Sequence, residues 1–512
     1  MQSRESTVIE YGWRRTAVTT AVIIATMLEI VDTTIVNVAL PNIQGNFGVP
    51  VDQGAWIVTG YIIANVIVIP ITPWLQLRFG RRAYYFASIA GFTIASAMCG
   101  FSGSFSALVF WRIIQGLAGG GLISTSQAIL RETYPLSEQG KAQGIFSMGV
   151  IVGPTLGPLL GGILTDQLSW RWAFFVNIPI GILSAALVWN YLRNPAAAQR
   201  KQLDWIGLGL LAVGLGSMQF VLDQGQQYDW FSDPTIRIFS ILALGGLASF
   251  VIWTLRSKIP VVDLHILRYR AVAAGCGLAM VLGVSLYGSV IILPQYVQNA
   301  LGFTATMAGE LILVRALAIG ALTPLTAILA SRGKVDTRYM IGAGFVVLGI
   351  SNWLLAGVTT SLSGFWSFGA ALALSGVALS QIFVPLSITV LGSVPPKEVP
   401  AASAFFNLSR QIGGSIATAA LVTILVRGFA IHQDALAGEI TLHASAITAY
   451  LQSHGGQYST GALQSLGAMV AAQAQVLSFA DTSRWVAIVS ILLSPLVFLL
   501  RRARPHAAAV VE

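Results

Sequence analysis

The stretch GVIVGPTLGPLLGG, residues 149–162, joins strong hydrophobicity to a regular spacing of glycine and proline. A glycine at every fourth residue gives a helix a flat groove against which a second helix packs closely. Each proline removes a backbone hydrogen bond and permits the helix to bend. The groove is expected to be either a static packing face or a seam about which helices flex. Its members are Gly149, Gly153, Pro154, Gly157, Pro158, Gly161 and Gly162.

The whole chain is nearly as apolar as this stretch. Of its 512 residues, 55% are hydrophobic and only 10% are charged, whereas a soluble domain usually carries about 25% charged residues. A run of about 20 apolar residues suffices to cross a bilayer. We therefore predict an all-α integral membrane protein with fourteen spans, at 16–40, 53–76, 83–101, 105–130, 142–165, 171–192, 204–222, 236–255, 271–298, 305–330, 338–358, 363–392, 400–427 and 484–501.

The basic residues give these spans an orientation. The formal net charge is +9, and in membrane proteins lysine and arginine gather in cytoplasmic loops. If the N-terminus is inside, the outer side keeps only arginines at span edges: Arg171, Arg237, Arg427 and Arg484. Both termini are therefore predicted to be cytoplasmic, and the first span to be retained rather than cleaved as a signal peptide. The positive charge orients loops and does not indicate binding of nucleic acid.

The first span carries two acids in the sequence MLEIVDTTIVNVALP, residues 27–41. A charged residue at the centre of a bilayer costs about 2.5–3.5 kcal/mol on insertion scales. Glu29 and Asp32 are three residues apart and share one helix face, so both are expected to face a cavity rather than lipid. Two carboxylates close together in a low dielectric favour a proton on one of them, which suits a carrier coupled to proton entry.

Further motifs follow in order along the chain. The sequence WLQLRFGRR follows the second span, WRIIQG lies in the fourth, WRWAFFVNIPIG opens the sixth, LDWIGLGLL opens the seventh, and NLSRQIGGSIATA lies in the thirteenth. Together with VDTTIVNVALP and GPTLGPLLGG, they cover nearly the whole chain. The chain resembles the fourteen-span drug:proton antiporters of the major facilitator superfamily, of the EmrB/QacA type, and is most similar to the EmrB side.

This resemblance implies two six-helix bundles around a central cavity, with two additional helices inserted between them. Alternating access would rock one bundle against the other. The implied segments are a cytoplasmic N-terminus 1–15, an N-terminal bundle 16–192, a cytoplasmic linker 193–203, two inserted helices 204–255, a cytoplasmic loop 256–270, a C-terminal bundle 271–501 with an extracytoplasmic loop 428–483, and a cytoplasmic tail 502–512.

The function implied is proton-coupled export of amphipathic or hydrophobic organic compounds across a bacterial inner membrane, by a secondary active transporter and not an enzyme. The chain has no P-loop sequence for ATP, and no cofactor or metal site is expected. The resemblance also implies a periplasmic adaptor and an outer-membrane channel as partners. The alternatives are a facilitator, an exporter of one specific metabolite, or a non-transporting membrane sensor of the same fold.

The fourth span supplies a counter-charge for the acids. Arg112 lies in WRIIQG, and in bundles of this family the first and fourth helices line the same cavity. We expect Asp32 to be the principal proton-coupling site, Glu29 to assist it or to bind cationic substrate, and Arg112 to modulate both. The alternative is a static buried ion pair that fixes helix packing. Glu310, near the outer end of the tenth span, is expected either to be wetted or to be a second proton site.

Uncharged polar residues in the spans are candidates for lining the cavity. For each of them, ordinary hydrogen bonding between helices is an equally good explanation. The two cysteines, Cys99 and Cys276, are far apart and are expected to be small core residues. The cavity candidates are Asn37, Gln115, Gln295, Gln381 and Asn407.

Two loops depart from simple connections. After the second span, Leu77 stands at a position that is acidic in many relatives, so the sequence does not predict the inner charge pair made there. The gating-loop residues Arg78, Gly80, Arg81 and Arg82 remain, and the arginines are expected to contact lipid phosphates or helix C-termini. The segment 428–483 is expected to form two amphipathic helices outside the membrane, either as a stiff connector or as a docking surface for the adaptor.

Overall fold

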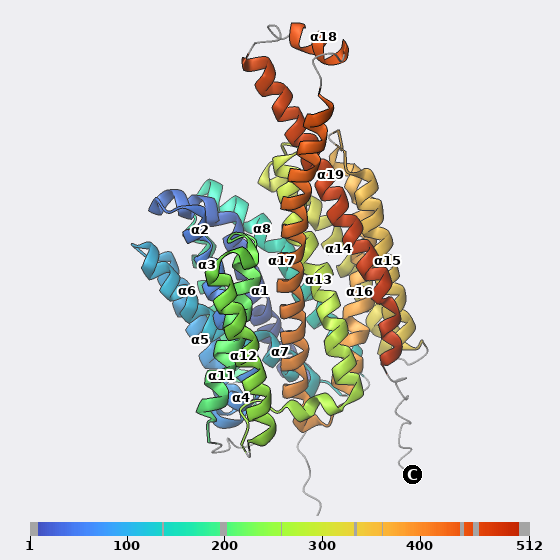
Figure 1. Ribbon diagram of the computed structural model, residues 1–512. Helices are drawn as coiled ribbons and strands as arrows, with labels where there is room; N and C mark the ends of the chain where they lie inside the picture. Colours follow the sequence, from blue (N-terminus) through green and yellow to red (C-terminus); the bar gives the residue numbers. More distant parts are fainter. Residues whose placement is uncertain are drawn as a thin grey trace, which may run out of the picture.

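The computed structural model describes residues 9–135, 138–194, 202–257, 259–331, 335–360, 362–440, 445–453 and 460–500. Within these ranges the chain is helical and contains no strand (Figure 1). The helices at the predicted span positions are α1 (Gly12–Phe47), α3 and α4 (Trp56–Val68, Thr72–Phe79), α5 (Arg81–Gly100), α6 and α7 (Phe105–Gly119, Leu122–Thr133), α8 (Gln139–Gln167), α9 and α10 (Trp172–Phe175, Asn177–Tyr191), α11 (Trp205–Gln224), α12 (Pro234–Arg256), α13 (Arg270–Asn299), α14 (Ala305–Ser331), α15 (Thr337–Val358), α16 (Gly369–Gly392), α17 (Val399–Glu439) and α19 (Thr460–Leu493).

The predicted all-α membrane architecture is confirmed. In the described residues, 12 helices are long and apolar enough to cross a membrane, and α8 brings the number to 13 if its two segments form one span. These segments, Gln139–Pro154 and Leu156–Gln167, meet at an angle of 41°, where Pro154 removes a backbone hydrogen bond. The helix α13 occupies the remaining predicted position, so each of the fourteen predicted spans coincides with a helix.

The helices form two halves that meet along a few of their members. In the N-terminal half, α1 packs on α8 and α10, and α5 packs on α6. In the C-terminal half, α13 packs on α17, and α15 on α16 and α19. The helix α8 also lies along α14, which joins the halves, and the pair α11–α12 sits at the side, with α11 touching α3 and α17.

A run of glycines breaks the fourth span into α6 and α7. A side chain at Gly120 would meet the carbonyl oxygen of Asn65 at 2.5 Å, and one at Gly121 would overlap the hydroxyl of Tyr84. Glycine is therefore required for the close approach of α3 and α5 to this break. Because a new helix begins at Leu122, its first backbone N–H groups have no partner within the helix and are available to a side chain from elsewhere.

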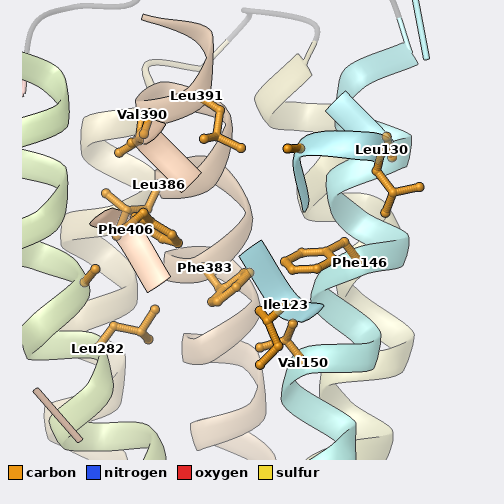
Figure 2. Close-up of a cluster of buried hydrophobic side chains, with 14 of the residues drawn as sticks. Ile123, Leu130, Phe146, Val150, Leu282, Phe383, Leu386, Val390, Leu391 and Phe406 are labelled. Carbon is orange, nitrogen blue, oxygen red and sulfur yellow. The ribbon is translucent and has the colours of Figure 1, made fainter. Parts of the chain in front are cut away.

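The halves share a buried apolar cluster near the starts of α8 and α17. The end of the molecule at which α19 finishes is here called the tail end (Figure 1). Ring centroids are 6.4 Å apart for Phe146 and Phe383, and 6.0 Å apart for Phe383 and Phe406. These rings come from α8, α16 and α17, and Figure 2 shows them with their aliphatic neighbours. The cluster thus holds the halves together at the tail end.

The segment 428–483 differs from the prediction of two separate amphipathic helices. The helix α17 continues without a break to Glu439, and α19 already begins at Thr460, so both extend beyond the expected span ends. Among the described residues between them, only the short α18 (Ser445–Ser453) forms a separate helix. These helices project from the end opposite the tail end (Figure 1). The chain has no proline between Pro400 and Pro495 and is rich there in alanine, leucine and glutamine, which favour helix continuation.

Candidate functional site

The acid Asp32 of α1 is paired with the arginine of α6. Arg112 Nη1 donates to Asp32 Oδ2 at 2.6 Å, and both side chains are completely buried. Charge-assisted hydrogen bonds of this kind are short and strong. The arrangement places the predicted counter-charge on the predicted acid, within the N-terminal half.

The other carboxylate oxygen of Asp32 is held by two amides. Gln115 Nε2 and Asn177 Nδ2 donate to Oδ1 at 2.9 and 2.8 Å. Asn177 in turn donates to Ser96 Oγ at 3.0 Å, which donates to the Phe174 carbonyl at 2.9 Å. Both oxygens of the ionised Asp32 therefore accept hydrogen bonds, from side chains of α6 and α10, and Ser96 of α5 positions Asn177.

The guanidinium of Arg112 is equally well satisfied. Its Nε donates to the Ile57 carbonyl at 3.0 Å, and Nη1 also donates to Gln115 Oε1 at 2.8 Å. The guanidinium lies 4.2 Å from the ring centre of Tyr61, where a cation–π contact adds to its stability. The ion pair is thus compensated on all sides, which makes it stable at rest and sensitive to any movement of α1 against α6.

The second acid, Glu29, has different partners. Asn65 Nδ2 donates to its Oε1 at 2.9 Å, and the backbone N–H of Ile123 donates to Oε2 at 3.1 Å. Ile123 lies at the start of α7, so the carboxylate occupies the positive end of that helix dipole. Arg410 of α17 attracts Glu29 electrostatically. The shared helix face therefore leads to two separate sites, since Glu29 is not an ion-pair partner of Arg112 among the described residues.

The glycine groove of α8 packs directly on α1. Side chains placed at Gly153 and Gly161 would meet Ile30 Cγ2 at 2.7 Å and the Ile35 carbonyl at 3.0 Å, whereas Gly149 leaves ordinary contact distance. On another side of α8, Gly144 lies against Ala327 of α14. The groove residues therefore hold α1 and its acids against α8, the helix that also packs on α14 of the other half. Pro154 and Pro158 lie inside the helix, and Gly162 is buried.

A buried polar bridge joins the halves near the apolar cluster. Gln127 Oε1 of α7 accepts hydrogen bonds from Ser403 Oγ and Asn407 Nδ2 of α17, each at 2.8 Å. Ser403 Oγ also donates to the Ser124 carbonyl at 2.9 Å. Among the cavity candidates, Asn407 thus acts between helices in this conformation, as the alternative explanation predicted.

The remaining cavity candidates are dispersed. Gln115 belongs to the Asp32 network, Asn37 is exposed and donates to the Thr33 carbonyl, and Gln381 is half-buried on α16. The side chain of Gln295 lies outside the described residues. The structure therefore does not bring these five polar residues together around one point.

The gating loop makes a charge pair despite the missing acid. Both terminal nitrogens of Arg81 donate to the carboxylate of Glu132 at the end of α7, and Arg81 Nε donates to Gln76 Oε1 at 3.1 Å. Arg82 lies over the ring of Trp189 at 4.6 Å. Glu132, in the last turn of α7, thus supplies the negative charge that Leu77 lacks. Contact of these arginines with lipid phosphates or helix C-termini stays a prediction.

Other parts of this loop have plain structural roles. Gly80 has a φ of 81°, a left-handed conformation that favours glycine, and it allows α4 to turn into α5. Arg78 in the last turn of α4 is half-buried. Within the described residues, no three histidine, cysteine or acidic side chains form a metal site, and Cys99 and Cys276 are buried and free.

Three contributors were missed by sequence reasoning. Asn177 lies inside the quoted WRWAFFVNIPIG motif, and Asn65 lies in the second span. The sequence did not indicate that these amides bind Asp32 and Glu29. Asp223, at the end of α11, accepts a hydrogen bond from Gln219 at 2.8 Å, and Gln219 also donates to Ser415 of α17 at 2.8 Å. Asp223 directly follows the predicted span 204–222, and this position was the signal in the sequence that could have identified it.

The fold and the buried Asp32–Arg112 network define a polytopic membrane carrier built from two packed halves. A family model described as Major Facilitator Superfamily matches residues 22–418. The chain belongs to this superfamily, and the resemblance to it is confirmed.

Relatives of the chain include named exporters. The chain is 34% identical over 429 residues to the Multidrug export protein EmrB of Escherichia coli (strain K12), covering 83% of each protein. It is 34% identical over 441 residues to the Fatty acid resistance protein FarB of Neisseria gonorrhoeae, covering 84% of each. The crystal structure of the human organic anion transporter MFSD10 (TETRAN) covers 93% of this chain and 99% of its own, with a TM-score of 0.57 and 14% identity, which is a likeness of fold.

Proposed function

We propose that this protein is a proton-coupled exporter of amphipathic or hydrophobic organic compounds in a bacterial inner membrane. The names of the EmrB relatives support multidrug export, and the membership of a transporter superfamily supports a carrier rather than an enzyme. Net outward transport against a gradient needs an energy source. The proton gradient can serve as that source if a buried carboxylate exchanges a proton for substrate.

The observation that carries the proposal is the ion pair between Asp32 and Arg112. Protonation of Asp32 would remove the charge that holds the Arg112 side chain and would weaken the hydrogen bonds that Gln115 and Asn177 donate to the carboxyl group. The freed arginine would then favour movement of α6 against α1. Proton binding is thereby linked to a change in helix packing, which is the requirement for coupling two states.

The test is efflux of a fluorescent dye from cells that express wild-type protein or Asp32→Asn, with and without a protonophore. Asp32→Asn should export no more dye than protonophore-treated wild type, at equal expression. The matched control is Asp166→Asn, because Asp166 lies exposed at the end of α8 and should export like wild type. Full protonophore-sensitive export by Asp32→Asn would move the coupling site to Glu29 or Glu310; Glu310 is exposed.

The same assay separates the alternative functions. A facilitator with the same fold would carry dye down its gradient when Asp32 is neutralised and would ignore the protonophore throughout. A non-transporting sensor would give no efflux in any variant. Only dye export against a concentration gradient, abolished by the protonophore, supports a proton-coupled exporter.

We also propose that the tail end is cytoplasmic and that the projecting helices contact a periplasmic adaptor of a tripartite pump. The basic gating loop lies at the tail end, in agreement with the positive-inside rule, and the extensions of α17 and α19 with α18 project from the opposite end (Figure 1). Trimming residues 434–478 should abolish capture of the adaptor while leaving dye binding intact. Unchanged adaptor capture would leave the extensions with the role of a stiff connector.

A further inference from the structure

Arg315 is a buried cation near the middle of α14. It is the eleventh residue of this helix, so it lies roughly 15 Å from the helix start at 1.5 Å per residue, close to the midplane of a 30 Å hydrocarbon core. Its side chain is only 2% exposed. Leu311 and Ile319, one turn to either side, are fully buried in two different apolar clusters, so Arg315 stands between them.

The charge of Arg315 is not compensated by the described part of the chain. Its Nε and Nη2 are buried and have no hydrogen-bond partner there, and Arg315 makes none of the ion pairs among the described residues. Buried polar groups are almost always hydrogen-bonded, and a buried charge without a partner is strongly unfavourable. Arg112 and Arg410, the other buried arginines of the spans, differ because each has an acid nearby.

Within the C-terminal half, the helices around Arg315 supply no acid that could reach it. Between Asp263 and Asp434 the only acids are Glu310, Asp336 and Glu398. Asp336 precedes α15 and binds Arg338, and Glu398 precedes α17 and binds Arg268. Glu310 is five residues from Arg315 on the same helix, which places it on another face, and it is exposed. No acid pairs with Arg315 in the described part of the chain, which leaves its charge open to an anion from outside.

The position of α14 indicates how a ligand would reach this cation. The helix packs on α8 of the N-terminal half and on α16 of the C-terminal half. A side chain at Gly376 of α16 would meet the Arg315 carbonyl at 2.5 Å, and one at Gly309 of α14 would meet Leu159 of α8 at 3.3 Å. Gly309 marks the face of α14 that meets α8, and Arg315 lies about 120° around the helix from that face, toward α16. A ligand would therefore reach Arg315 only when α14 moves against both helices.

We propose that Arg315 binds the acidic group of an amphipathic organic anion, so that the C-terminal half recognises the substrate's carboxylate or sulfonate. The planar guanidinium matches such groups through paired hydrogen bonds, and Leu311 and Ile319 receive the apolar body. This inference rests on the proposed export function, because access to Arg315 requires the halves to move. Organic anions are then one class of substrate. The carboxylates of Asp32 and Glu29 in the N-terminal half would not attract such substrates, whereas Arg315 would.

The test is equilibrium binding to the full-length protein in lipid nanodiscs, with empty nanodiscs subtracted. The probes are dodecanoate and dodecyltrimethylammonium, which share a chain and differ in head-group charge. Wild type should bind dodecanoate, and Arg315→Gln should bind it at least tenfold more weakly with unchanged binding of the cation. Arg315→Lys should recover part of the affinity, because it restores the positive charge without the paired hydrogen bonds of the guanidinium. Arg237→Gln, at an exposed arginine of α12, is the matched control and should equal wild type.

Three outcomes would overturn this inference: equal dodecanoate binding by wild type and Arg315→Gln, equal loss of both probes, or no dodecanoate binding by wild type. Efflux of the same probes separates it from the export proposal. If wild type exports the cation with protonophore sensitivity but neither binds nor exports dodecanoate, export stands and the anion site falls. If dodecanoate binding depends on Arg315 but the protonophore changes no efflux, the anion site stands and proton-coupled export falls.

Discussion

The two halves of this molecule treat a buried arginine in opposite ways. In the N-terminal half, Arg112 meets a carboxylate, a carbonyl, an amide oxygen and an aromatic ring. In the C-terminal half, Arg315 is just as deeply buried but its Nε and Nη2 have no partner among the described residues. One half therefore has a closed electrostatic network, and the other has a charge that awaits a ligand.

The difference teaches how work can be divided within one carrier. Under the proposed function, the closed network of Asp32 responds to a proton, because protonation removes the negative charge that Arg112 pairs with. An open charge such as that of Arg315 responds to an anion, because binding supplies the missing member. Proton and substrate would then act on different halves, and the helices that join the halves, α8 and α14, would transmit their effects.

The largest expected effect comes from removing the arginine of the closed network. Arg112→Met leaves Asp32 buried without its counter-charge, and breaking a buried pair in this way typically costs about 3–5 kcal/mol. Unfolding of purified protein in mixed micelles should show a loss of this size at neutral pH, with Arg237→Met unchanged. A loss below about 1 kcal/mol, the usual worth of an exposed pair, would show that Arg112 is not needed to balance Asp32.

The opposite sign is expected for the open charge. Arg315→Met removes an uncompensated cation from the bilayer centre, where arginine costs about 2.5–3.5 kcal/mol on insertion scales, so the ligand-free protein should become more stable by up to that amount. Dodecanoate should raise the melting temperature of wild type by mass action and leave the variant unchanged. Destabilisation of ligand-free Arg315→Met would instead mean that Arg315 has a structural partner.

The sequence predicted the fold well because each span is a long apolar run with polar limits. It also predicted that Asp32 and Arg112 belong together. It failed where partners depend on three-dimensional packing. Nothing local in the sequence indicates that Glu29 binds the start of α7, or that Glu132 replaces the acid missing at Leu77. Both contacts join residues that are far apart along the chain, and neither follows from helix periodicity.

The limits of the C-terminal helices were missed for a different reason. The sequence after residue 427 loses its hydrophobicity, which predicted the end of a membrane span. Leaving the membrane does not end a helix, however, and α17 continues to Glu439 because no proline interrupts good helix-forming residues. Hydropathy and helix propensity report on different properties, and in this segment they separate.

An intermediate effect on stability and efflux is expected at the glycine groove where α8 meets α1. A methyl group at Gly157 would lie 2.8 Å from Thr34 Cβ and 3.0 Å from the Ile35 nitrogen, so Gly157→Ala must push α8 from α1, and overpacking of this kind typically costs about 1–3 kcal/mol. Gly320→Ala on α14 is the matched control, since a Cβ at Gly320 meets nothing within 4 Å. Dye efflux should fall for the first variant only; equal efflux would make the groove a tolerant packing face.

The smallest effect concerns the polar bridge between the halves. Hydrogen bonds between membrane helices average about 0.6 kcal/mol in double-mutant cycles, so the cycle of Gln127→Ala with Asn407→Ala should give a coupling near that value. The pair Thr337 and Thr389, whose hydroxyls are 3.1 Å apart within the C-terminal half, provides the comparison. If the bridge belongs to one transport state, saturating substrate should abolish the first coupling and preserve the second. If the Gln127–Asn407 coupling persists with substrate bound, α7 and α17 move together. In that case α17 would have to be assigned to the same moving unit as the N-terminal half.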